Sequence, residues 1–238
     1  QTDPSIVAGV LRVSNSGLYA PPSPVTDLGD AVTMLGIKEI YRIVNLVTSG
    51  KFLEGELTSM DIQKGGLWKH SLAVALFMEI IASDCTQYEG LPYTLGLLHD
   101  IGKLALHHRC GPSYVDVFRK VETERVALNI AEADTLGFDH AEAGAKMLEN
   151  WGFPKEVYIP IRYQYDPSQA GAYRELAGAL QVANWASSVI GCNDGRDSWA
   201  LEMNPDVFQI EESKLESALL EGRLRLELAV KALEPGVN

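Results

Sequence analysis

The chain has 238 residues, of which 46% are hydrophobic and 22% are charged, and this composition is typical of a globular protein with a large core. Its formal net charge of −12 argues against a general affinity for nucleic acid or anionic lipid, because both attract positive charge. No apolar run approaches the roughly 18 residues of a transmembrane helix, so we expect no membrane partner.

The three cysteines, Cys85, Cys110 and Cys192, lack the spacing of a metal-binding motif. Reduced thiols are typical of the cytoplasm, where we expect the protein to be located. The sequence shows no signal peptide and begins at Gln1 without a methionine, so a native upstream segment is conceivable.

Helical periodicity runs through most of the chain, and no strand-like alternation extends beyond a few residues. Asp3-Pro4 and Thr26-Asp27 are typical starts of helices, and we expect a further helix over residues 37–47. Later helices are expected over residues 66–82, 113–120, 122–136, 140–150, 155–165 and 172–190, and within 205–233. The sequence therefore predicts an all-α fold.

A His-Asp pair, His99 and Asp100, follows an apolar run that reads as a buried helix, and Gly102 is the expected end of that helix. An imidazole and a carboxylate held together suit a divalent metal ion. His70 lies on the buried side of the helix 66–82, as either a ligand or a hydrogen-bonded core residue. His140 follows the expected cap Asp139 and is either a ligand or part of the cap.

Four motifs occur in order: GLWKHSLAVA at 66–75, GLLHDIGK at 96–103, LGFDHAEAG at 136–144 and NWGFP at 150–154. Together they resemble the HDOD domain family, a signalling relative of the HD and HD-GYP metal-dependent phosphohydrolases. The resemblance runs from about residue 3 to residue 192. It implies an HD-like helical bundle with a smaller N-terminal helical lobe. We expect the lobe at residues 1–55, the bundle at 56–192, and a C-terminal loop and helix packing on the bundle at 193–238.

The resemblance implies a first metal site formed by His70, His99, Asp100 and Asn184. The family places an aspartate at the fourth position, whereas the amide of Asn184 contributes no charge. We therefore expect a degenerate site that binds at most one divalent ion, such as Fe, Mn, Ni or Mg, and binds it weakly.

The resemblance also implies a second metal site, of which His140 and Gln164 are the remnant. Gln164-Tyr165 stands where HD-GYP proteins have two histidines, so a two-metal phosphodiesterase mechanism is not expected. Lys103 matches a lysine that HD-GYP enzymes place at the substrate. It either contacts a phosphate or acidic ligand or lies on a solvated helix face.

The resulting expectation is a non-catalytic bacterial signal-transduction (output) domain whose degenerate HD-type pocket binds a signalling protein partner or a small ligand. Two alternatives stay open: a metal-dependent phosphohydrolase with a weak one-metal site, and a regulator that binds a cyclic dinucleotide or another nucleotide through Lys103.

Overall fold

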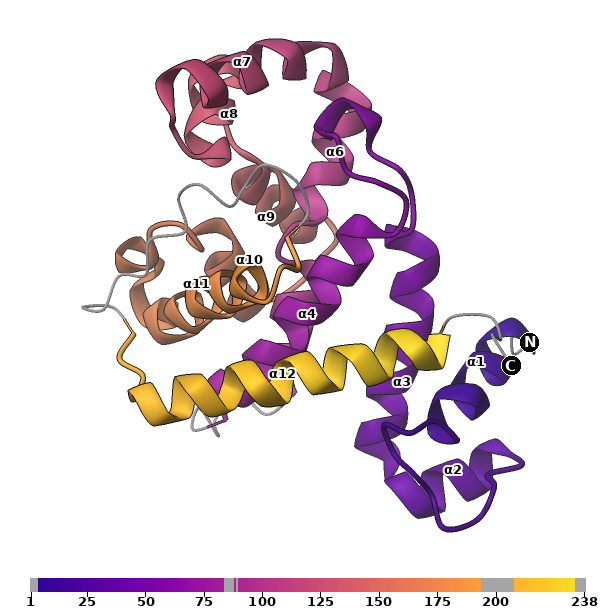
Figure 1. Cartoon of the computed structure of the whole chain (residues 1–238). Coiled ribbons are helices and arrows are strands. Elements are labelled where there is room, and N and C mark those ends of the chain that lie inside the picture. Colours follow the sequence, from indigo (N-terminus) through magenta and orange to yellow (C-terminus); the bar gives the residue numbers. More distant parts are fainter. Residues whose placement is uncertain (1–3, 84–87, 89, 194–207, 234–238) are drawn as a thin grey trace. The chain divides into compact units, whose positions relative to one another are not determined.

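The computed structural model describes residues 4–83, 88, 90–193 and 208–233 (Figure 1). Within these ranges the elements are helices, and the one β-type contact is an isolated bridge between Leu57 and Ile62. The prediction of an all-α fold is therefore confirmed. None of the described helices combines the length and the apolar character that crossing a bilayer requires.

The chain divides into two compact units, of which the smaller comprises Gln1–Glu54 with Arg223–Asn238 and the larger Gly55–Gly222. The boundary between the units at Gly222 falls inside α12 (Glu212–Leu233), so that helix contributes to both. The expected loop after residue 193 lies largely outside the described residues.

The smaller unit contains α1 (Pro4–Ser14), α2 (Leu28–Leu35) and α3 (Ile37–Leu53). Asp27 caps α2, since its carboxylate accepts a hydrogen bond of 2.9 Å from the backbone nitrogen of Asp30. α1 packs tightly on α3, because a Cβ at Gly9 would lie 2.6 Å from the side chain of Val47.

The larger unit is arranged around one apolar helix. Its elements are η1 (Thr58–Met60), α4 (Gly66–Ile81), α5 (Leu91–Leu98), α6 (Ile101–Cys110), η3 (Gly111–Ser113), α7 (Tyr114–Glu124), α8 (Leu128–Leu136), α9 (His140–Asn150), α10 (Lys155–Arg162), η4 (Pro167–Tyr173), α11 (Arg174–Val189) and the start of α12. Every residue of α4 from His70 to Met78 is buried, as expected of a helix that is apolar on nearly all sides. α5 and α11 pack on it.

Two glycines bring the helix backbones around the His-Asp pair into contact. A Cβ at Gly96 on α5 would lie 2.4 Å from the Cα of Ala75 on α4. A Cβ at Gly102 on α6 would lie 1.9 Å from the carbonyl oxygen of His140 and 2.6 Å from the nitrogen of Gly144, both on α9. Only residues without a side chain allow such approaches.

The expectation that Gly102 ends a helix is wrong. α5 already ends at Leu98, and Gly102 lies in the first turn of α6. Its role is to permit the close packing of α6 against α9. Other boundaries shift by a few residues, and the break expected near residue 121 falls at Arg125, which has a left-handed φ of 54°.

Candidate functional site

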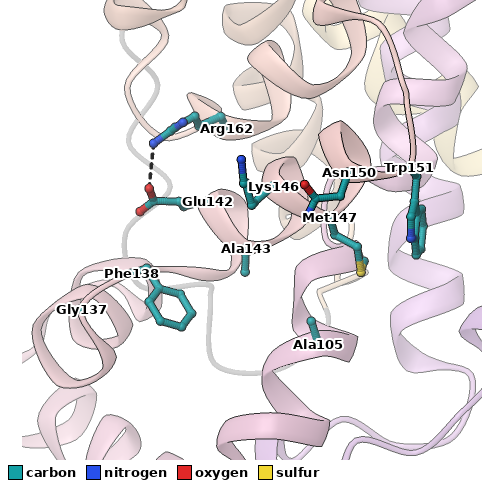
Figure 2. A pocket seen from close by; sticks show the side chains of 10 residues that line it. All are labelled: Ala105, Gly137, Phe138, Glu142, Ala143, Lys146, Met147, Asn150, Trp151 and Arg162. Carbon is teal, nitrogen blue, oxygen red and sulfur yellow. Dashed lines mark hydrogen bonds and ion pairs between the residues drawn. The ribbon is translucent and has the colours of Figure 1, made fainter.

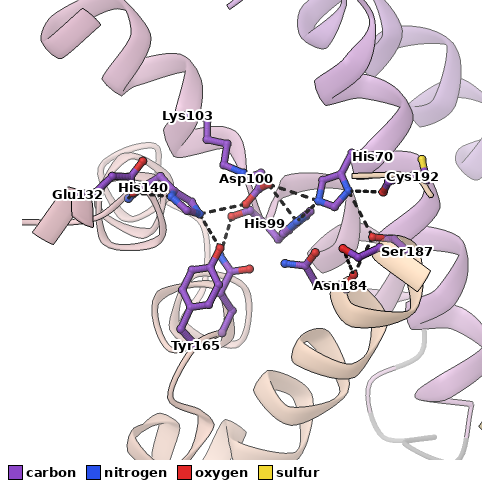
Figure 3. Close-up of polar contacts among 12 residues, drawn as sticks. His70, His99, Asp100, Lys103, Glu132, His140, Tyr165, Asn184, Ser187 and Cys192 are labelled. Carbon is purple, nitrogen blue, oxygen red and sulfur yellow. Dashed lines mark hydrogen bonds and ion pairs between the residues drawn. The ribbon is translucent and has the colours of Figure 1, made fainter. Parts of the chain in front are cut away.

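A buried cluster of charged and imidazole side chains lies in the larger unit, where α4, α8 and α9 meet the junction of α5 and α6 (Figure 3). Each of its members is exposed by 2% or less, and we call it the polar cluster: His70, His99, Asp100, Lys103, Glu132 and His140. Burying so many polar groups is costly unless they are paired, so their contacts determine what the site can do.

The structure brings His70, His99 and Asp100 together. The Nε2 atoms of His70 and His99 lie 3.2 Å apart. Oδ2 of Asp100 lies 3.5 Å from the first of these nitrogens and 3.3 Å from the second. Each residue thus offers one ligand atom, and the three atoms lie within 4.8 Å of one another.

Backbone carbonyls fix the orientation of both imidazoles. Nδ1 of His70 donates to the oxygen of Cys192 at 2.9 Å, and Nδ1 of His99 donates to the oxygen of Gly96 at 2.8 Å. Because a carbonyl only accepts hydrogen bonds, each Nδ1 carries a hydrogen, and the Nε2 of each ring faces the Nε2 of the other. Histidine ligands are commonly held in this way, so the two rings fit one metal ion.

Asn184 and Lys103 limit the charge that these residues offer to a cation. Asn184 on α11 is 3% exposed, and Figure 3 shows its amide on the side of the cluster that carries His70 and His99. The ammonium of Lys103 donates to Oδ2 of Asp100 at 2.8 Å, the same oxygen that faces the two imidazoles. The residues therefore fit a single divalent ion, held by donors with little net negative charge.

Lys103 does not lie on a solvated helix face, because the structure buries it completely. Three positions apart on the chain, Lys103 and Asp100 form an ion pair in which both side chains are about 1% exposed. A nucleotide phosphate would have to displace this buried pair in order to reach the ammonium.

The second metal position has only part of its expected donors. His140 lies near Asp100, with 3.5 Å between its Nε2 and Oδ1, and the same Nε2 is 2.7 Å from the hydroxyl of Tyr165. Gln164 donates from its amide nitrogen to the backbone oxygen of His99 at 3.1 Å. Its amide oxygen and Oδ1 of Asp100 are buried without a hydrogen-bond donor among the described atoms. Gln164 thus supports the backbone at His99.

Glu132 belongs to the site although the sequence analysis did not single it out. Its Oε2 lies 2.6 Å from Nδ1 of His140 and accepts a hydrogen bond of 2.9 Å from the backbone nitrogen of the same residue. The hydroxyl of Tyr114 donates to the other carboxylate oxygen. A signal was present, because Glu132 follows the buried Leu128 by four residues and so lies on the buried side of α8.

Two pKa values depart strongly from their ordinary range. Burial alone would raise the pKa of Asp100, but the charges of His99 and Lys103 outweigh burial and hold this pKa well below its usual value. Burial alone would lower the pKa of His140, but the carboxylate of Glu132 raises it well above its usual value. Lys103 and a charged His140 therefore balance the carboxylates of Asp100 and Glu132.

We expect the imidazole of His140 to be charged at pH 7, and Glu132→Gln to bring its pKa back toward the ordinary value. The substitution should cost about 1.5–3 kcal/mol of stability, since it weakens a hydrogen bond to a charged group. Because the folded-state pKa lies above 6.5, this stabilisation is complete below pH 6.5 and is lost as the pH rises through the folded-state pKa. NMR titration of the histidine rings and urea unfolding at several pH values measure both effects.

The control for this experiment is Glu124→Gln, which changes a half-exposed carboxylate 3.8 Å from Lys120 on α7. It should alter stability by no more than about 0.5 kcal/mol. If His140 titrates at its ordinary pKa in the parent protein, the assigned pairing with Glu132 is wrong.

A family model described as the HDOD domain matches residues 1–167. A crystal structure from Shewanella amazonensis SB2B, of a protein provisionally described as a phosphohydrolase, is 25% identical with a TM-score of 0.76, covering 97% of this chain and 83% of that one. A structure from Marinobacter aquaeolei VT8, of a protein provisionally described as a signal transduction protein, is also 25% identical with a TM-score of 0.73, covering 97% of this chain and 52% of that one.

Among curated sequences, Ribonuclease Y of Campylobacter jejuni is 26% identical over 226 residues, which are 90% of this chain and 40% of that protein. The chain spans only 35% to 40% of the length of the first curated relatives that it matches.

Proposed function

This chain belongs to the HDOD domain family, and on that premise we propose that it is a non-catalytic bacterial signal-transduction domain that binds a signalling protein partner or a small ligand. The similarity to the Marinobacter protein supports a signalling role. Within the described residues neither Cys110 nor Cys192 forms a disulfide, which supports a cytoplasmic location, and Cys85 lies outside those residues.

The observation that carries this proposal is the burial of the polar cluster. A phosphodiester must bring its phosphorus atom within bonding distance of the attacking water, and an open coordination position must face the substrate. The side chains of His70, His99 and Asp100 are each exposed by 2% or less, and Asn184 by 3%. In this conformation a phosphodiester does not reach them.

The donor set also supports a non-catalytic role, because the second metal position has only part of its expected donors. A single ion held by His70, His99, Asp100 and Asn184 would polarise a phosphate and acidify a bound water, whereas a two-metal phosphodiesterase needs a second ion. At the second position, Gln164 bonds a backbone carbonyl and the hydroxyl of Tyr165 contacts His140. The two-ion arrangement of a phosphodiesterase therefore lacks part of its donors at the second position.

A one-metal phosphohydrolase is the second candidate, and one observation favours it. The facing Nε2 atoms of His70 and His99, 3.2 Å apart and beside Oδ2 of Asp100, are what a bound cation would explain. Similarity to the Shewanella protein points the same way.

A turnover assay separates the two candidates. We expect no hydrolysis of cyclic di-GMP or of bis-p-nitrophenyl phosphate in the presence of manganese or ferrous iron. The control is His99→Ala, which removes one of the two imidazole donors. Turnover that the parent shows and this variant lacks would establish the phosphohydrolase and disprove the non-catalytic role.

A further inference from the structure

A groove separate from the polar cluster runs along α9. We call it the α9 groove; it has a volume of about 780 Å³, and none of the six residues of the polar cluster lines it. Figure 2 shows Phe138 at one end and Trp151 at the other, with apolar side chains between them: Ala105, Ala143 and Met147. Lys146 and Arg162 lie along the edge of the groove that is away from Ala105.

The ends of the α9 groove are large aromatic side chains that a folded chain seldom leaves in water. Trp151 is 53% exposed and Phe138 is 37% exposed. Exposed apolar surface with a polar rim is typical of interaction sites, and aromatic residues commonly contribute most of the binding energy of an interface. The two aromatics are therefore the expected anchors of an occupant.

The spacing of these anchors indicates an elongated occupant. α9 has 11 residues and is thus roughly 16 Å long. Phe138 precedes its first residue by two positions, and Trp151 directly follows its last. A compact small molecule would contact one anchor, whereas a peptide helix lying along α9 would contact both.

The charge of the rim indicates an acidic occupant. The lining contains two cations, Lys146 and Arg162, against one carboxylate, Glu142, in a chain whose formal net charge is −12. Lys146 pairs with Glu149 at 2.6 Å and Arg162 with Glu142 at 2.7 Å. All four side chains are more than 40% exposed, so these pairs contribute little to stability and exchange readily for carboxylates of a partner.

We propose that the α9 groove binds an acidic amphipathic helix of a partner protein, with its apolar side between Phe138 and Trp151 and its carboxylates at Lys146 and Arg162. The inference rests on the proposed signalling function and gives it a surface and a class of partner. α9 also carries His140, three residues before Ala143, into the polar cluster. The same helix therefore contacts the partner on one side and the polar cluster on the other.

The test uses a fluorescein-labelled peptide of about 15 residues, or roughly four helical turns, with leucines on one face and glutamates on the other. Fluorescence anisotropy with the full chain should show binding that weakens with added salt. A scrambled peptide of the same composition and a version with lysine in place of glutamate should not bind. Trp151→Ala should weaken binding about tenfold or more, as expected for an aromatic anchor.

Charge reversal provides a test that does not endanger folding. Lys146→Glu should weaken peptide binding severalfold, because it removes an attraction and adds a repulsion at an exposed position. Arg119→Glu on α7 is the matched control. Arg119 is 66% exposed and Lys146 65%, and each forms a 2.6 Å pair with a carboxylate three positions away. The control should leave binding unchanged.

Three outcomes would overturn the assignment of the α9 groove. They are equal binding of the designed and scrambled peptides, equal binding by Lys146→Glu and the parent, and self-association of the chain that Trp151→Ala abolishes. The last result would show that the α9 groove binds a second copy of this chain. Phosphodiester turnover with intact peptide binding would instead disprove the non-catalytic function and leave the groove as a docking site.

Discussion

Replacement of Gly102 by alanine is expected to destabilise the larger unit by at least about 3 kcal/mol, because the added carbon overpacks a contact between backbones. That carbon would lie 1.9 Å from the carbonyl oxygen of His140, which belongs to the rigid backbone of α9. α6 and α9 must separate to accommodate it, which moves Asp100 away from His140. Urea unfolding followed by far-UV circular dichroism measures the loss.

Gly111 provides the matched control at the other end of α6. Its backbone is right-handed helical, with φ −45° and ψ −48°, and a Cβ there would approach Ser59 no closer than 3.4 Å. Gly111→Ala should leave stability unchanged or raise it by about 0.4–1 kcal/mol through the unfolded state. Equal stabilities of Gly102→Ala and the parent would refute the close packing of α6 and α9.

Replacement of Asn184 by aspartate is expected to tighten the binding of one manganese ion by up to roughly a hundredfold. The variant adds a second carboxylate beside His70, His99 and Asp100. Interaction free energies between groups in contact are commonly ~0.5–3 kcal/mol. At about 1.4 kcal/mol per factor of ten, the upper value corresponds to this change. Isothermal titration of parent and variant with manganese measures it.

Gln181→Glu is the control for this titration, since it adds the same charge to α11 one helical turn earlier. The amide of Gln181 donates to the backbone oxygen of Tyr165 at 3.4 Å, so this side chain is used elsewhere. We expect no comparable gain in manganese affinity. Equal affinity of Asn184→Asp and the parent would mean that Asn184 does not face the two imidazoles.

Local signals in the sequence predicted much of the fold. The expected cap Asp139 accepts a hydrogen bond of 2.7 Å from the backbone nitrogen of Glu142 and begins α9, as Asp27 does for α2. Helical spacing placed His70 on the buried side of the helix over residues 66–82, and His70 is buried on α4. Such features can be predicted from the sequence because a cap and a periodic pattern involve residues close together in the chain.

Features that depend on contacts between residues far apart in the sequence could not be predicted in this way. The requirement for glycine at position 102 comes from α9, about 40 residues later, and a glycine after an apolar run equally resembles a helix end. Lys103 is buried because its ammonium pairs with Asp100, whereas its sequence position fitted a solvated face as well. Glu132 acquires its role only when α8 places it against His140.

The metal content of the protein purified without added metal distinguishes a weak one-metal site from a complete two-metal site. Elemental analysis by mass spectrometry gives the number of divalent ions per chain. We expect less than one ion per chain, because Lys103 already pairs with the shared oxygen of Asp100 and Asn184 adds no charge. Two tightly bound ions per chain that resist dialysis would disprove the degenerate site, since they would show that Gln164 and Tyr165 do not prevent a complete two-metal site.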